Sequence, residues 1–169
     1  MDESAFRSAR DAMTPRPCAF EKAMLAAACA CSLALRRNIA ERESVTCASP
    51  AARAQCAELR DLLRQKSAFA LKLAHTQGPL PHAKEMKVEC GGLLGVQKAA
   101  AAAEPACADA RVLQLTTRTD VCGEPPFLAD VHSLVRACAE KFGGLANLPY
   151  SDIVQSVVAF QMRQRRSGS

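Results

Sequence analysis

Cysteines are the residues of this chain whose number and spacing suggest chemistry. Nine of the 169 residues are cysteine, and three of them fall within the alanine-rich stretch CAFEKAMLAAACAC at residues 18–31. Cysteine thiolates bind zinc and iron–sulfur clusters, and they also act as redox groups and nucleophiles. In a cytoplasmic protein, which we expect here, nine thiols favour metal or redox chemistry over structural disulfides.

The spacing of the cysteines excludes the common local motifs. No two cysteines are separated by two residues, which argues against zinc fingers, thioredoxin-like dithiols and bacterial ferredoxin loops. The ligands of a bound metal must therefore come from separate elements that the fold brings together. The candidate cofactor-binding residues are Cys18, Cys29, Cys31, Cys47, Cys56 and Cys90, and the candidate metal ligands among them are Cys18, Cys29, Cys47, Cys56 and Cys90.

Several of these cysteines stand at positions that favour a thiolate. Cys47 lies just before a helix start at Ser49, where the local positive potential lowers a thiol pKa. Cys90 precedes Gly91 and Gly92, and Cys122 precedes a glycine in a turn. Glycines allow backbone amides to approach and donate to sulfur, which an iron–sulfur cluster requires. We therefore expect an iron–sulfur cluster as the cofactor, with zinc as the alternative.

Other interpretations stay open. Buried cysteine also serves as a small apolar core residue, and Cys138 and Cys107 are expected to do so, while Cys31 and Cys56 fit either role. The main alternative function is thus a metal-free helical interaction or accessory protein. A cysteine nucleophile is a third hypothesis, and the sequence leaves open whether the chain is an enzyme. His75 and His82 are expected to be turn or surface residues.

The cysteines must be positioned by helices, because alanine is abundant and aromatic residues make up only 4% of the chain. A first helix is predicted over residues 17–40, where a straight helix places Cys29 and Cys31 about 200° apart. A second is predicted from Ser49, as N-cap, to about His75. The short connection between them predicts an N-terminal antiparallel helical hairpin.

The remaining chain continues the helical pattern. A third helix is predicted from about Pro81, interrupted at Gly91–Gly92 and resumed through the alanine run 99–103. Residues 111–121 (RVLQLTTRTDV) have the β-branched content of a strand. Further helices are predicted over 126–142, ending at a Gly143–Gly144 cap, and over 151–163. The expected fold class is all-α, an irregular bundle of about five helices.

We expect a flexible N-terminus over 1–16, a single helical domain over 17–163 and a basic tail over 164–169. A division of this domain into two sub-units, 17–104 and 105–163, stays open. The net charge is +5, and the lysines and arginines are spread among acidic residues without forming a basic stripe interleaved with aromatics. Nucleic acid is therefore not an expected partner. The apolar run 23–35 is too short to span a membrane, and no secretory signal is evident. The expected partner is an unidentified redox or assembly protein, with a homodimer as a further option.

Overall fold

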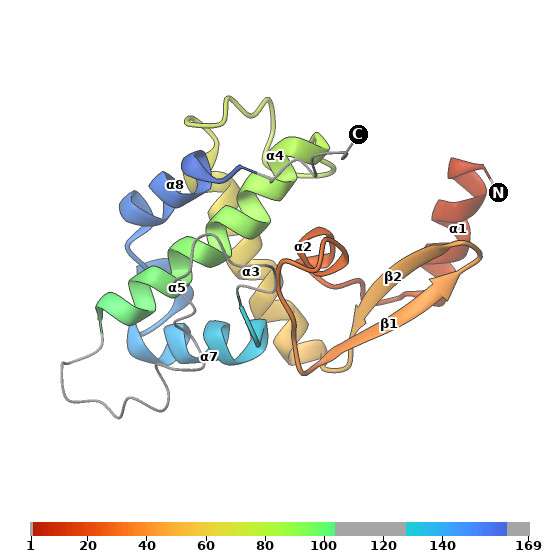
Figure 1. Cartoon of the computed structure of the whole chain (residues 1–169), viewed down its shortest axis with the longest axis horizontal. Helices are drawn as coiled ribbons and strands as arrows, with labels where there is room; N and C mark the ends of the chain where they lie inside the picture. Colours follow the sequence, from red (N-terminus) through yellow and green to blue (C-terminus); the bar gives the residue numbers. More distant parts are fainter. Residues whose placement is uncertain (1, 104–127, 162–169) are drawn as a thin grey trace, which may run out of the picture.

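The computed structural model describes residues 2–103 and 128–161. Its elements in chain order are α1 (Glu3–Met13), α2 (Glu21–Leu25), β1 (Ala34–Ile39), β2 (Arg42–Cys47), α3 (Pro50–Ser67), α4 (His82–Met86), the π-helical turn η1 (Lys87–Gly91), α5 (Gly92–Ala102), α7 (Val131–Lys141), the 3-10 turn η2 (Leu145–Asn147) and α8 (Tyr150–Ala159). Figure 1 shows a body built from α3, α4, α5, α7 and α8. The β1–β2 hairpin and α1 project from one side of this body.

The expected all-α fold class is wrong, because the described residues contain a two-stranded antiparallel sheet. β1 and β2 form a hairpin in which Ala34 lies opposite Cys47 and Ile39 lies opposite Arg42. Ala40, in the two-residue turn, has a φ of 55°, the left-handed backbone that tight hairpin turns use. The protein is therefore a mixed helical and β structure.

The predicted helix over 17–40 is also wrong. Only α2 is helical within it, and residues 26–33 form turns and loop that lead into β1. Ala27, with a φ of 55°, lies in the turn that follows α2. Since the long first helix does not form, the predicted N-terminal antiparallel helical hairpin does not exist.

The predicted start of α3 is confirmed. Ser49 is the N-cap, its side chain accepts a hydrogen bond from the Ala52 amide at 3.2 Å, and Pro50 is the first helical residue. Leu59 and Leu63 on its inner face are completely buried. The helix ends at Ser67 instead of near His75, and turns follow it.

Gly91 and Gly92 do not interrupt the third helical segment, which runs from α4 through η1 into α5. A Cβ atom at Gly91 would lie 2.7 Å from Cα of Val157 in α8, and one at Gly92 would lie 2.6 Å from a methyl carbon of Leu63 in α3. These glycines therefore allow neighbouring helices to approach closely, and their amides belong to the helix.

The C-terminal part of the body follows the sequence pattern closely. The predicted cap after α7 is confirmed, because Gly143 has a φ of 69° and the Gly144 amide donates to the Ala139 carbonyl at 2.8 Å. Cys138 in α7 is fully buried, as expected for a core residue. α8 begins at Tyr150, and its Ile153 is also buried in the core.

Some expectations fall outside the described residues. These are the strand content of 111–121, the cysteines Cys107 and Cys122, and the basic tail 164–169. α1 occupies most of the stretch 1–16 for which a flexible N-terminus is expected, and Asp2 caps it by accepting from the Ala5 amide. Within the described ranges, no helix has the length and apolar character that crossing a membrane requires.

Candidate functional site

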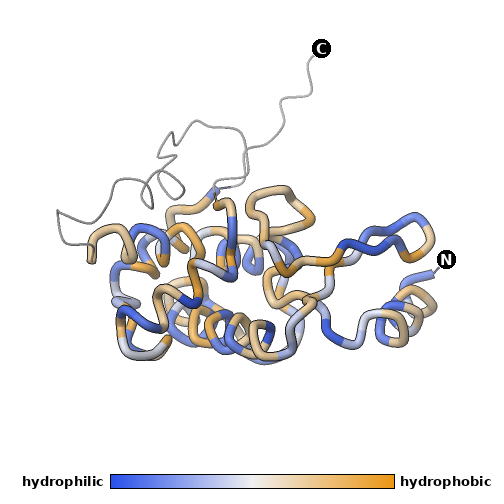
Figure 2. The backbone as a smooth tube through the Cα atoms, turned by 90° about the horizontal axis from the view of Figure 1, so that it is seen from below, coloured by the Kyte–Doolittle hydropathy of each residue, from blue (hydrophilic) through white to orange (hydrophobic). Residues whose placement is uncertain are grey.

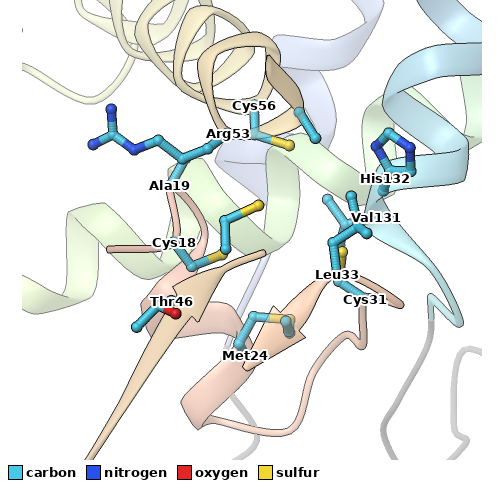
Figure 3. Close-up of a pocket in the computed structure, with 13 residues that line it drawn as sticks. Cys18, Ala19, Met24, Cys31, Leu33, Thr46, Arg53, Cys56, Val131 and His132 are labelled. Carbon is cyan, nitrogen blue, oxygen red and sulfur yellow. The ribbon is translucent and has the colours of Figure 1, made fainter. Parts of the chain in front are cut away.

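Four cysteines from separate parts of the chain line one small cavity beside the hairpin. They are Cys18, Cys31, Cys47 and Cys56. The volume of the cavity is about 20 Å³, which is room for one water molecule. Figure 3 shows the side chains around it, with Cys56 on α3, Cys18 before α2 and Cys31 near His132 of α7. Apart from Thr46, Arg53 and His132, the remaining lining residues are apolar.

Strand pairing positions Cys18 and Cys47. Pro17 forms a bridge opposite Thr46, the Cys18 amide donates to the Val45 carbonyl at 2.9 Å, and the Cys47 amide donates to the Arg16 carbonyl at 3.1 Å. Cys18 and Cys47 are therefore diagonal neighbours on one face of this short ladder. Diagonal neighbours have Cα atoms about 7–8 Å apart, so the two thiols face the cavity side by side without being opposite each other.

Cys56 and Cys31 approach from a helix and a loop. Cys56 lies on the second turn of α3, and only 9% of its surface is exposed. Cys31 belongs to the loop 26–33, which is attached to the start of α7 by backbone hydrogen bonds: Ala30 donates to Leu128 at 3.0 Å, and Val131 donates to Ala30 at 2.9 Å. One side of the cavity is thus a fixed helix and the other is a loop.

Backbone amides are directed at two of the sulfurs. Burial raises the pKa of the Cys18 thiol to about 11, while the Phe20 amide acts in the opposite direction. Burial also raises the pKa of the Cys31 thiol, while hydrogen bonds from the amides of Leu33 and His132 lower it. Burial raises the pKa of Cys56 to about 12. These three thiols are therefore protonated at neutral pH, and a metal that binds them must displace their protons.

Two helix N-termini meet at the cavity. Cys47 precedes the first residue of α3 by three positions, and the His132 amide that serves Cys31 lies in the first turn of α7. Helix N-termini carry a partial positive charge that favours thiolates and other anions. Arg53 lies at the edge of the cavity. Its Nε donates to the Pro17 carbonyl at 3.2 Å, and this hydrogen bond connects the Cys18 segment to α3.

Cys29 and Cys90 are not brought to this cavity. Both are buried, and the Cys29 thiol donates to the Met24 sulfur at 3.5 Å. The amides near Cys90 are helical, so the expectation that Gly91 and Gly92 free donors for its sulfur is wrong. The structure therefore brings together four of the six candidate cofactor-binding residues, and three of the five candidate metal ligands. Cys31 joins them because residues 26–33 form a loop.

The seven cysteines in the described ranges are free thiols. Among residues 2–103 and 128–161, no group of three or more His, Cys, Asp or Glu side chains is arranged to hold one metal ion. A tetrahedral zinc site with Zn–S bonds of about 2.3 Å needs sulfurs about 3.8 Å apart.

His132 lines the cavity, although the sequence analysis did not assign it to a site. It occupies the second position of α7 and is half-buried at the cavity. In the sequence, His132 lies at the edge of the apolar face of its helix. That position does not indicate which part of the protein the side chain contacts. His75 and His82 do not line the cavity.

The burial of Glu89 predicts a pH-dependent stability. Its carboxylate is 3% exposed and accepts from the Ala23 amide at 2.8 Å. Burial raises its pKa to about 7, with Glu85 adding to the rise while the Ala23 amide and the more distant Lys22 and Arg60 oppose it. The folded state thus binds this proton more tightly than the unfolded chain does. The stabilisation is complete below the ordinary glutamate pKa near 4.5 and is lost as the pH rises through about 7.

We expect the unfolding free energy of the metal-free protein to decrease by about 3 kcal/mol between about pH 5 and pH 8 through this group. Urea unfolding at a series of pH values measures the decrease. In Glu89→Gln the decrease should be absent, whereas the exposed control Glu58→Gln should keep it. An equal pH slope in the wild type and Glu89→Gln would contradict the assignment.

Comparison with known proteins does not add to these observations. No family model matches the chain, and no curated protein or solved structure has significant similarity to it. The function must therefore be inferred from the residues of the chain and their arrangement.

Proposed function

We propose that the protein binds an iron–sulfur cluster at the four-cysteine cavity and acts in electron transfer, redox sensing or cofactor assembly. The observation that carries the proposal is the convergence of Cys18, Cys31, Cys47 and Cys56, from four different segments, on one mostly apolar cavity. Four cysteine thiolates are the usual ligands of [2Fe–2S] and [4Fe–4S] clusters.

The relative positions of Cys18 and Cys47 favour a [4Fe–4S] cluster over a single ion. In a [4Fe–4S] cluster each thiolate binds a different iron atom, so the cysteine sulfurs stand farther apart than around one zinc. The diagonal positions of Cys18 and Cys47 on paired strands suit that wider spacing. A cluster is larger than the cavity of about 20 Å³, so its insertion requires the cavity to widen.

The surroundings of the thiols also support a cluster. Amides of Phe20, Leu33 and His132 are directed at sulfur, and such donors tune cluster potentials. The partial positive charges of the α3 and α7 N-termini stabilise the negative charge that four thiolates bring. A catalytic cysteine, in contrast, needs a lowered pKa, while burial raises the pKa of the Cys18, Cys31 and Cys56 thiols.

Metal and sulfide analysis of the anaerobically purified chain tests the proposal. We expect iron and acid-labile sulfide in equal amounts, at least two of each per chain for the smaller cluster, with visible absorption that bleaches on reduction. Stoichiometric zinc without sulfide would support the zinc alternative instead. The absence of iron, sulfide and zinc from chains with full helicity would favour a metal-free interaction protein and overturn the proposal.

A further inference from the structure

β1 is an edge strand whose outer side has no partner among the residues that the structure describes. The sheet contains only β1 and β2, and the outer side of β2 is covered by residues 16–18. α1 contacts the hairpin next to its turn, where Arg42 of β2 pairs with Glu3 at 2.8 Å. Ile39 is buried there, while residues 35–38 of β1 are exposed. In Figure 2 much of the hairpin, next to the N-terminus, is coloured hydrophilic.

The hydrogen bonds of β2 identify the free groups of β1. The Val45 carbonyl accepts from Cys18, and the Cys47 amide donates to Arg16, so the backbone groups of both residues point away from β1. Arg36 is the register partner of Val45, and Asn38 follows it by two positions. Because the direction alternates along antiparallel strands, the amides and carbonyls of Arg36 and Asn38 point outward. No described residue is bonded to them.

Arginines occupy two of the four exposed positions along this edge. Arg36 and Arg37 are both exposed. Arg36 pairs with Glu43 across the hairpin at 2.9 Å and donates to the Met24 carbonyl at 3.0 Å. No ion pair is formed by Arg37 within the described ranges. Opposite charges on facing strands stabilise a pair of strands, so an added strand with acidic side chains complements this edge.

A second copy of the chain complements it less well. Antiparallel pairing of two β1 edges through Arg36 and Asn38 places Arg37 directly opposite its own copy. Pairing centred on Arg36 places two Arg36 side chains opposite each other. Like charges in these positions are destabilising, and charged side chains on an edge strand are a common means of preventing self-association.

We propose that the outer edge of β1 binds an extended acidic segment of a partner protein as a third strand. This inference rests on the proposed cluster for its purpose, because β1 leads directly from the site. Cys31 lies three residues before β1, and Leu33 and Ala34 line the cavity. A strand added along β1 therefore brings the partner to the cluster, which is the contact that a redox or assembly partner needs.

A peptide-binding experiment on the full chain tests whether the outer edge of β1 binds an extended acidic segment. The probes are an extended peptide that alternates glutamate with valine, the same peptide with lysine in place of glutamate, and a single-stranded oligonucleotide of equal charge. The variants are Arg37→Glu and Asn38→Pro, which removes one outward amide and which an edge strand tolerates. Their matched controls are Arg136→Glu, an exposed residue of α7, and Asn38→Thr.

We expect the glutamate peptide to bind, at least about tenfold more weakly to Arg37→Glu and to Asn38→Pro, and unchanged to both controls. Binding should weaken with salt. The inference is overturned if the glutamate peptide does not bind, if the lysine peptide or the oligonucleotide binds equally well, or if Asn38→Pro binds normally. Concentration-dependent dimers that Asn38→Pro abolishes would also overturn it.

The same titration is repeated with the Cys56→Ala chain, which we expect to lack the cluster. Peptide binding by the Cys56→Ala chain would show that the strand edge binds without the cluster, and peptide binding by a wild-type chain that purifies without iron and sulfide would support the edge while refuting the cluster proposal. If the wild-type chain holds iron and sulfide but does not bind the glutamate peptide, the cluster proposal is supported and the proposed peptide binding at β1 is refuted.

Discussion

Replacing any one of Cys18, Cys31, Cys47 and Cys56 with alanine is expected to lower the iron bound per chain at least about tenfold. The loss of groups that merely orient metal ligands already weakens metal binding about 10–100-fold, and these four are proposed as the ligands themselves. The measurement is iron and sulfide per chain after anaerobic purification, together with the visible spectrum. Far-ultraviolet circular dichroism verifies that each variant is folded.

Three buried cysteines away from the cavity provide matched controls. Cys29→Ala, Cys90→Ala and Cys138→Ala remove thiols that are as buried as Cys56 or more so but do not line the cavity. We expect each to retain the iron and colour of the wild type, with a modest loss of stability from the small cavity left behind. Retention of the cluster by one of the four variants, with loss in Cys29→Ala or Cys90→Ala, would show that the wrong thiols have been assigned.

The second large effect is expected at the ion pair that fixes α3 to α4. Arg64 is 7% exposed and Glu85 is 3% exposed. The guanidinium donates to both carboxylate oxygens, with contacts of 2.8 and 2.7 Å, and also to the Gly78 carbonyl at 3.1 Å. Glu85→Ala leaves the Arg64 charge buried without its carboxylate. We expect it to reduce the unfolding free energy by about 3–5 kcal/mol in urea unfolding of the metal-free chain.

Asp61→Ala is the control for this pair. Asp61 pairs with Arg60 at 3.0 Å on the surface of the same helix, and removing it should change the stability by less than about 1 kcal/mol. The double variant Arg64→Met with Glu85→Leu should recover much of the stability, since it removes both buried charges. If Glu85→Ala cost no more than Asp61→Ala, the pair would not hold α3 in the way that the structure indicates.

The parts of the fold that the sequence predicted are those with local signals. Ser49 followed by Pro50 marks the start of α3, and Gly143–Gly144 marks the end of α7. In each case the cap depends on the properties of the residues at that position. Cys138 was correctly identified as a core residue because it lies in the middle of a regular apolar stripe.

The hairpin could not be predicted in this way. Its turn contains Ala40 in a left-handed conformation, whereas hairpin turns are usually recognised by glycine or asparagine. Ala27 has the same conformation after α2. Alanine at both positions extended the apparent helix over residues 17–40, and tertiary contacts overcame that local propensity.

The candidate site was predicted in part for the same reason. On a continuous helix Cys29 and Cys31 point in different directions, so only one of them was retained as a metal ligand, and it was Cys29. In the structure the loop 26–33 directs Cys31 to the cavity, while Cys29 contacts Met24. The proximity of Cys18 and Cys47 depends on strand pairing between residues 16–18 and β2, which helical spacing does not reveal.

Anomalous diffraction at the iron edge from anaerobically grown crystals is the most direct measurement of the four-cysteine site. The expected result is a single iron feature within bonding distance of the Cys18, Cys31, Cys47 and Cys56 sulfurs. Iron bound at Cys29 and Cys90, or four protonated thiols around an iron-free cavity in protein grown with iron and sulfide, would contradict it.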